Sequence, residues 1–246
     1  MATAGPQRVF LCTAVFYVPE EPSIKKSAFI IFSLGLFSLC YSGEKYIALT
    51  FDDGPHEVFT GEIIRMLESE GCRATFFLVG MMVERNPGLV KLIQKKGMEI
   101  GNHSYDDSRL KYLAEEKKKE SIVRTSGLIE EITGEPVRFF RPPGGRYDWG
   151  TIALAEEEGL EVILWDVNSN DSGGRLTQTA LLNNVLAHAE NLSIVLLHSG
   201  RNATLEVLPM LLRTLKSRGF SMVTVSELKE RGKKCYLSEK RQRSLF

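Results

Sequence analysis

Two adjacent carboxylates, Asp52 and Asp53, end a short apolar run (residues 46–51) that is typical of a buried strand. Adjacent residues of a strand point to opposite faces, so a bend is needed before both carboxylates can face one site. Gly54 and Pro55 follow directly and are expected to supply it. Two carboxylates in one pocket suggest that one binds a cation and the other acts as a base. The alternative is a solvated turn, since Asp-Asp-Gly-Pro is also good turn chemistry.

A second polar segment, residues 101–107, contains an imidazole and a carboxylate four residues apart. On a helical turn, His103 and Asp107 would lie on one face and could bind one metal ion. With Asp53 as a third ligand, one position would remain for water, as in catalytic zinc sites. The alternative is a polar loop in which Asp106 or Asp107 caps a following helix.

Three further segments follow in an order that makes the chain resemble the polysaccharide deacetylase family, the NodB-homology domain or carbohydrate esterase family 4. The resemblance extends from about Lys45 to about Glu230. Five segments in a fixed order are far more specific than any one of them. The three added segments are Arg141-Pro142-Pro143-Gly144-Gly145, Trp165 to Asp171, and Leu196-Leu197-His198.

The resemblance implies a role for each matching residue in the hydrolysis of an N-acetyl group on a sugar. Asp52 would take a proton from water, and Arg141 would pair with Asp52 and orient it. His198 would protonate the leaving amine, and the backbone N–H of Gly144 would help to bind the oxyanion. A metal suits this reaction because it polarises the carbonyl and lowers the pKa of water. The implied metal ligands are Asp53, His103 and Asp107.

Position 107 departs from the family pattern, which usually has a second histidine there. A carboxylate is a sound zinc ligand, so a divalent metal, zinc first, is expected. Asp107 makes the site harder and more anionic, which favours manganese or cobalt as alternatives. The other interpretation is a site that has lost its metal.

Asn168 is a second departure, because the family usually has an aspartate there that tunes the catalytic histidine. A neutral amide can orient an imidazole but cannot stabilise its charge, so an aspartate at 168 is expected to raise the pKa of the acid. Asp166 or Asp171 could substitute for it. Ser172 is a third departure, at a position where the family often has tryptophan.

The ends of the chain differ from its middle. Residues 1–43 are expected to be a leader, with a signal-peptide-like or anchor segment at about 25–42. Its apolar run of about 14 residues is short for a membrane span, which needs about 20. The predicted location is therefore secreted or in the cell envelope, and the alternative is membrane attachment through an uncleaved leader. Residues 44–232 are the expected catalytic domain, and 233–246 a basic tail.

Composition excludes little else. The 246 residues carry 31 basic and 31 acidic side chains, so no basic excess indicates a nucleic-acid partner. A disulfide between Cys72 and Cys235 is an open alternative in an oxidising compartment. The sequence carries no signal of oligomeric state.

Strand-like and helical segments alternate, which predicts parallel strands with helices outside them. The expected fold is α/β, and the resemblance specifies a distorted, incomplete (β/α) barrel of about seven strands with the site at their carboxyl ends. Strands are predicted at 46–51, 74–79, 98–101, 139–141, 162–166, 193–198 and 220–223. Helices are predicted at 60–70, 87–96, 114–133, 149–158, 177–189 and 205–218.

The leading hypothesis is a metal-dependent deacetylase of an N-acetylated glycan polymer such as peptidoglycan or chitin. Tyr105, Tyr147 and Trp149 are candidates for stacking on sugar rings, and Leu196 is a further substrate-binding candidate. One alternative is a catalytically impaired member of the same fold that binds a glycan. Another is a hydrolase of a small cyclic amide.

Overall fold

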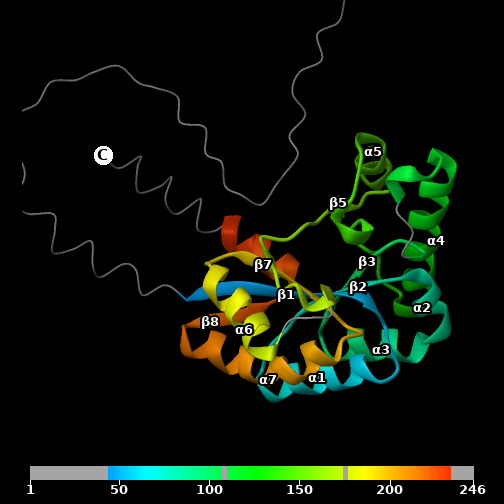
Figure 1. The fold of residues 1–246 in the computed structure, drawn as a ribbon. Helices are drawn as coiled ribbons and strands as arrows, with labels where there is room; N and C mark the ends of the chain where they lie inside the picture. Colours follow the sequence, from blue (N-terminus) through cyan, green and yellow to red (C-terminus); the bar gives the residue numbers. More distant parts are fainter. Residues whose placement is uncertain (1–43, 107–109, 174–176, 234–246) are drawn as a thin grey trace, which may run out of the picture. The chain divides into compact units, whose positions relative to one another are not determined.

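The computed structural model describes residues 44–106, 110–173 and 177–233 (Figure 1). Contacts divide the chain after Glu44, and the fold below is that of the unit that begins at Lys45. The expected leader and residues 234–246 of the expected tail, with Cys235, lie outside the described residues. Among the residues that are described, no helix has the length and apolar character needed to cross a membrane.

Within the described residues, eight parallel strands form one sheet in the order β5-β4-β3-β2-β1-β7-β6, and β8 pairs with the beginning of β1. This arrangement confirms the expected incomplete barrel. The strands are β1 Lys45–Gly54, β2 Thr75–Leu78, β3 Glu99–Asn102, β4 Phe139–Phe140, β5 Glu161–Val162, β6 Val167–Asn168, β7 Ser193–His198 and β8 Phe220–Val223.

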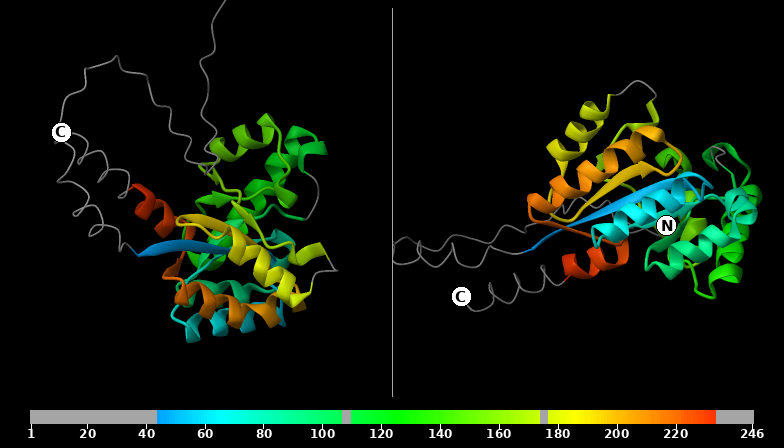
Figure 2. Two further views of the ribbon diagram at one scale, coloured as in Figure 1. Left: turned by 60° about the vertical axis from the view of Figure 1, so that its left-hand side comes forward. Right: turned by 90° about the horizontal axis from the view of Figure 1, so that it is seen from below.

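Helices cover the outside of the sheet, and Figure 2 shows α1 and α7 side by side along it. The predicted helices are present, each within a few residues of its expected bounds. A short helix, α2, and a helix over residues 225–233 were not predicted. The helices are α1 Phe59–Ser69, α2 Gly80–Arg85, α3 Pro87–Lys95, α4 Glu115–Thr133, α5 Trp149–Glu157, α6 Gln178–His188 and α7 Asn202–Ser217. Three single turns are η1 Leu110–Tyr112, η2 Pro143–Gly145 and η3 Asp171–Gly173.

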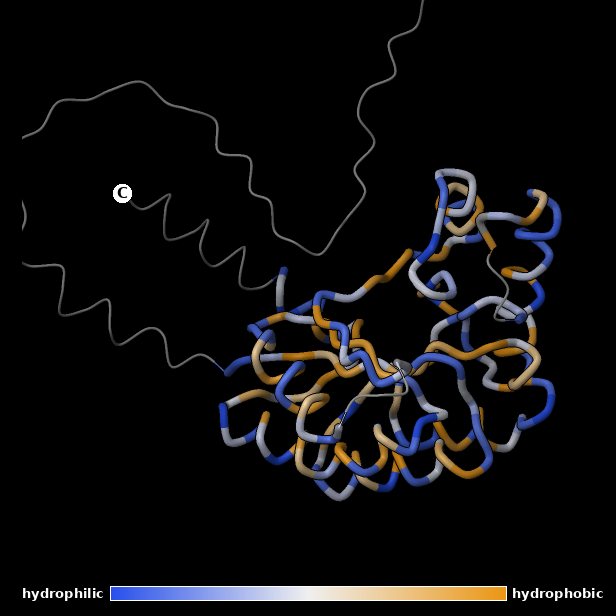
Figure 3. The backbone as a smooth tube through the Cα atoms, viewed as in Figure 1, coloured by the Kyte–Doolittle hydropathy of each residue, from blue (hydrophilic) through white to orange (hydrophobic). Residues whose placement is uncertain are grey.

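The two faces of β1 have different environments. Ile47, Leu49 and Phe51 belong to the apolar cluster beneath the helices. Ala48 belongs to a second, smaller cluster. Thr50 and Asp52 lie on the same face of β1 as Ala48, because every second residue of a strand points to the same side. Figure 3 shows hydrophobic residues along the strands. The Ala48 face of β1 thus changes from apolar to polar toward the carboxyl end of the strand, where the predicted site lies.

The predicted strand over 162–166 is wrong beyond Val162, where β5 ends, and β6 begins only at Val167. These two strands are the edges of the sheet, and residues 163–166 join one edge to the other. The carbonyls of Ile163 and Leu164 accept hydrogen bonds from the side chain of Arg141, at 3.1 Å each, and not from a strand. A side chain therefore replaces strand pairing where the barrel stays open.

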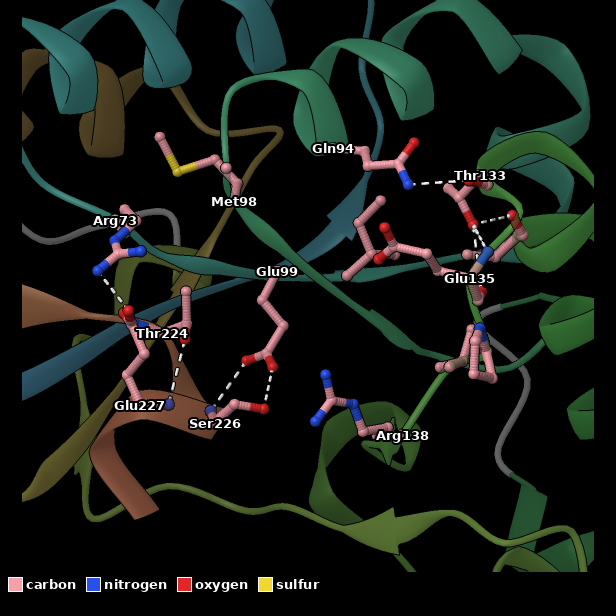
Figure 4. Close-up of a pocket in the computed structure, with 15 residues that line it drawn as sticks. Arg73, Gln94, Met98, Glu99, Thr133, Glu135, Arg138, Thr224, Ser226 and Glu227 are labelled. Atoms are coloured by element: carbon pink, nitrogen blue, oxygen red, sulfur yellow. Dashed lines mark hydrogen bonds and ion pairs between the residues drawn. The ribbon is translucent and has the colours of Figure 1, made fainter. Parts of the chain in front are cut away.

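A cavity of ≈ 360 Å³ lies near the amino-terminal ends of β2 and β3, and Figure 4 shows the residues that line it. Glu99 accepts hydrogen bonds from the Thr75 hydroxyl (2.8 Å), from the backbone N–H of Ser226 (3.1 Å) and from the Ser226 hydroxyl. Thr224 and Glu227 form a reciprocal capping box at the start of the helix over 225–233. The polar groups of the cavity thus join this helix to the sheet.

Replacement of Glu99 by alanine should lower the free energy of unfolding by about 1–3 kcal/mol, because two hydroxyls and a helix N–H lose their acceptor. Urea unfolding measures the change. Glu135→Ala is the matched control, since Glu135 is an exposed carboxylate on the same cavity, and a change within about 0.5 kcal/mol is expected there. Equal effects of the two substitutions would contradict the role given to Glu99.

Candidate active site

The carboxyl ends of the parallel strands bring the predicted polar residues to one edge of the sheet. Each comes from a different strand or from the turn that follows it. Asp52 and Asp53 end β1, His103 follows β3, Arg141 follows β4, Asp171 lies in η3 after β6, and His198 ends β7.

Asp52 is held by a buried cation. Arg141 is fully buried, and its Nη1 donates to Asp52 Oδ1 (2.8 Å) and to Thr50 Oγ1 (2.7 Å). Its guanidinium lies 4.0 Å from the ring centre of Phe77. Burial lowers the pKa of Arg141, and the charge of Asp52 and its hydrogen bond oppose this. The pairing occupies Oδ1 of Asp52 and leaves Oδ2 for the site.

A bend turns Asp53 toward the same site as Asp52. Asp53 has a φ of +72°, and the pairing of β1 with β2 shifts in register between Phe51 and Gly54. Oδ2 of Asp52 and Oδ1 of Asp53 then lie 3.7 and 3.6 Å from Nε2 of His103. The bend that the sequence predicts is present, and it begins at Asp53 itself.

His103 presents Nε2 to these carboxylates because Nδ1 is engaged elsewhere. Nδ1 lies 2.7 Å from the carbonyl oxygen of Arg141, which can only accept, so Nδ1 carries a hydrogen. Nε2 then carries a lone pair, and one carboxylate oxygen each of Asp52 and Asp53 lies within 3.7 Å of it. Tetrahedral zinc ligands lie roughly 3.3 Å apart, so Asp53 and His103 fit a shared metal. The carbonyl contact is typical of a metal-binding histidine.

The third predicted ligand, Asp107, lies outside the described residues. Within the described ranges, no three histidine, cysteine, aspartate or glutamate side chains converge as a metal site. The predicted helical turn is wrong over residues 103–106, which form a loop in which Ser104 has a φ of +64°. That left-handed conformation cannot continue a right-handed helix.

The loop after His103 is anchored by α2. The N–H groups of Gly80 and Met81, at the start of α2, donate to the carbonyls of Ser104 and Tyr105 at 2.9 Å each. Free N–H groups at a helix start need such acceptors. The short helix α2, which was not predicted from the sequence, therefore positions the loop that follows His103, a predicted metal ligand.

Tyr105, a predicted sugar-stacking residue, is partly exposed and is held by neighbouring side chains. Its hydroxyl donates to Glu84 (2.8 Å), and the guanidinium of Arg124 lies 3.8 Å from the centre of its ring. Its backbone N–H donates to Ser121 (2.8 Å). These contacts make Tyr105 an anchor of the loop that carries His103, and its contact with a sugar stays a prediction.

His198 is held by an aspartate. Nδ1 lies 2.6 Å from Oδ1 of Asp171, whose Oδ2 accepts from the backbone N–H of His198 (2.7 Å) and the hydroxyl of Thr204 (2.6 Å). Burial opposes ionisation of Asp171, but these hydrogen bonds hold its pKa below the usual range. Burial also disfavours charged His198, yet the bond and charge of Asp171, with the charges of Asp52 and Asp53, raise its pKa. Such a histidine suits a general acid.

Asn168 does not take the role that the sequence analysis gave it. It is exposed, and its side-chain oxygen accepts from the N–H of Asn170 (2.8 Å). In the register of β6 and β7 it lies beside Leu196, two residues before His198. Asp171 in the following turn reaches His198 instead, as one of the sequence-based alternatives allowed. Asp166 accepts from the N–H of Ile194 (2.8 Å).

Gly144 and Gly145 form the turn η2 with φ of +61° and +65°. A Cβ on Gly145 would lie 2.6 Å from the ring of Trp165, whereas one on Gly144 would contact nothing within 4 Å. Gly145 thus permits close packing of Trp165, and Gly144, whose N–H is the predicted oxyanion donor, is exposed.

The remaining substrate-binding candidates differ in exposure. Trp149, at the start of α5, is 69% exposed, and Tyr147 is partly exposed. Leu196 is buried within β7, beside Thr50 in the register of β1 and β7. Thr50 accepts a hydrogen bond from Arg141, and Thr204 donates one to Asp171. Neither was recognised in the sequence, where nothing distinguishes them from other threonines.

Comparison with known proteins places these features in a family. The sequence profile of the family described as "Polysaccharide deacetylase" matches residues 41–163. A peptidoglycan-N-acetylglucosamine deacetylase of Bacillus cereus is 37% identical over 191 residues, which are 76% of this chain and 89% of the relative. The structure of peptidoglycan deacetylase PdaC from Bacillus subtilis matches with a TM-score of 0.76 at 31% identity, over 81% of this chain and 97% of that chain.

A similar fold is also found without activity. The wild-type protein BA3943, described as a carbohydrate esterase family 4 pseudoenzyme from Bacillus anthracis, matches with a TM-score of 0.71 at 29% identity, over 75% of this chain and 65% of that chain. The fold alone therefore does not establish activity, and the side chains of the site have to be tested.

Asp171→Asn should lower the pKa of His198, because it removes the carboxylate charge while burial still disfavours the imidazolium. NMR titration of the ring protons in metal-free protein measures this, and only four histidines need assignment. Asn168→Asp is the matched comparison and should leave the His198 pKa nearly unchanged. A rise with Asn168→Asp and no fall with Asp171→Asn would restore the role predicted for position 168.

Proposed function

Because the chain belongs to the polysaccharide deacetylase family, we propose that it is a metal-dependent hydrolase that removes N-acetyl groups from the amino sugars of a polysaccharide. Peptidoglycan is the proposed substrate, since similar proteins are named for it. The observation that carries the proposal is the pairing of Asp52 with His198. They are register partners on neighbouring strands, and each is held by an oppositely charged group.

Asp52 and His198 suit the roles of base and acid. Adjacent strands lie about 4.8 Å apart, so the two side chains can flank one reacting carbon. The hydrogen bond from Arg141 orients Asp52 through Oδ1, and the other oxygen, Oδ2, can take a proton from the attacking water. Asp171 favours protonated His198, which can give its proton to the departing amine through Nε2. An amine is a poor leaving group unless it is protonated, so both groups are needed.

Asp53 and His103 would hold the metal, and Asp107 is the proposed third ligand. When bound, the metal supplies Lewis-acid polarisation of the amide carbonyl and acidifies water. The N–H of Gly144 would donate to the oxyanion that develops as water attacks. Zinc is the first metal to test, with cobalt and manganese as alternatives.

The proposed place of action is outside the cytoplasm. Peptidoglycan lies there, and the sequence at about 25–42 fits a signal peptide or an anchor. A glycan-binding protein without activity is the second candidate function, because a pseudoenzyme shares the fold. The intact pairs of Asp52 with Arg141 and His198 with Asp171 favour the enzyme, since binding alone needs neither an acid nor a base.

Acetate release from peptidoglycan and from N-acetylglucosamine oligomers tests the proposal. Chelated protein should be inactive and should recover with zinc, cobalt or manganese. Asp52→Asn should lower kcat by about 10²–10⁴-fold, because the base is lost. Asp166→Asn should retain activity, because Asp166 is not one of the reacting groups and asparagine still offers an oxygen acceptor to the N–H of Ile194. Oligosaccharide binding without release under any metal would establish the binding protein instead.

Trp149→Ala should raise KM for oligomers about 3–10-fold with little change in kcat, because an exposed indole at the start of α5 can stack on a sugar ring. Steady-state kinetics on oligomers of increasing length measure the effect. Met210→Ala is the control, since Met210 is 55% exposed on α7. An unchanged KM for every oligomer would remove Trp149 from the binding site.

A further inference from the structure

Lys118 is the one lysine that is buried among the side chains described, with 6% of its surface exposed. It lies near the amino-terminal end of α4, where the helix dipole disfavours a cation. Burial of an ammonium group needs a charged partner. The partner is Asp148, whose Oδ2 lies 2.6 Å from Nζ of Lys118.

Asp148 joins α4 to α5. Its Oδ1 accepts from the N–H (2.8 Å) and the hydroxyl (2.7 Å) of Thr151 and so caps the start of α5. The bonds from Lys118 and Thr151 hold the pKa of Asp148 below its usual range. One carboxylate therefore connects the first turns of two helices.

The segment between Arg141 and Asp148 carries the amide of Gly144. Arg141 anchors one end in the barrel, and Asp148 anchors the other on α4. Two consecutive glycines in left-handed conformations lie between these anchors, and glycine restricts the backbone less than any other residue. The direction of the Gly144 N–H thus depends on how firmly both ends are held.

The same helix also supports the loop of His103. The side chain of Asn102 donates to the carbonyl of Ile122 (2.8 Å), and Ser121 accepts from the N–H of Tyr105 (2.8 Å). These contacts lie one turn further along α4 than Lys118. The helix therefore sets the position of a predicted metal ligand and of the glycine turn relative to each other.

We propose that the Lys118–Asp148 ion pair is a positioning device that fixes the backbone amide of Gly144 for oxyanion binding. This inference rests on the proposed deacetylase function. An oxyanion contact forms in the transition state and not in the bound substrate, so its loss lowers kcat and leaves KM nearly unchanged. A residue that merely stabilises the fold has no reason to produce this split.

Four variants separate the pair from its surroundings. Lys118→Met removes the cation and keeps most of the buried chain. Asp148→Asn removes the charge and keeps a good helix cap. The double variant tests whether the two act as a unit. Lys117→Met is the control, because Lys117 is an exposed neighbour whose ion pair with Glu120 stays within α4.

Acetate-release kinetics are measured on each variant, together with hydrogen–deuterium exchange of the segment 142–147, in which residues 144–147 carry a backbone N–H. Lys118→Met and Asp148→Asn should each lower kcat about tenfold or more, change KM less than about twofold, and speed exchange in 142–147. The double variant should be no worse than the more impaired single variant, since interacting residues are not additive. Lys117→Met should match the wild type in both measurements.

The outcomes keep the two proposals apart. Suppose that the wild type is active and that Lys118→Met and Asp148→Asn have the same kcat and the same exchange rates as the wild type. This result would overturn the positioning role and leave the proposed deacetylase function intact. A wild type without activity would overturn the proposed function, and the exchange of 142–147 would then decide whether the pair holds the turn. If Lys118→Met does not fold, Asp148→Asn decides, since its helix cap is retained.

Discussion

One buried guanidinium connects the fold to the site. Arg141 donates to the carbonyls of Ile163 and Leu164, in the segment that joins the two edges of the sheet, and to Thr50 and Asp52 in β1. A cation can be buried only if its donors find partners and its charge is compensated. The group that occupies the open side of the barrel is therefore also the group that orients the proposed base. Fold closure and chemistry are not separable here.

The two ends of the barrel use polar groups differently. At the amino-terminal ends of β2 and β3, Glu99 and its partners satisfy one another and join the last described helix to the sheet. At the carboxyl ends, Oδ2 of Asp52 and Oδ1 of Asp53 lie 3.7 and 3.6 Å from Nε2 of His103, beyond hydrogen-bond distance. Satisfied polar groups stabilise a structure, whereas carboxylates and an imidazole that lie close together without bonding one another are suited to a cation. This contrast favours the carboxyl ends, and not the cavity, as the place of the proposed chemistry.

Supports outside the strands complete the arrangement. The loop after His103 depends on the first N–H groups of α2. The glycine turn lies between Arg141 and Asp148, which caps α5 and forms an ion pair with Lys118. His198 depends on η3, because Asp171 reaches it from beyond the end of β6. The parallel sheet brings the residues near each other, but turns and helix starts set their orientation. Loss of any one support would misplace a group whose own side chain is unchanged.

The sequence by itself determined the alternation of strands and helices and the positions of Asp52, Asp53 and His198 at strand ends, because side-chain periodicity and glycine placement act over a few residues. The incomplete barrel followed from the family resemblance of its ordered segments. The tertiary structure decided which groups meet. Asp171 rather than Asn168 contacts His198, Tyr105 packs against Arg124, and residues 163–166 bridge the edges of the sheet. These contacts join residues far apart in the chain, and their geometry depends on strand register and helix position, which no local pattern encodes.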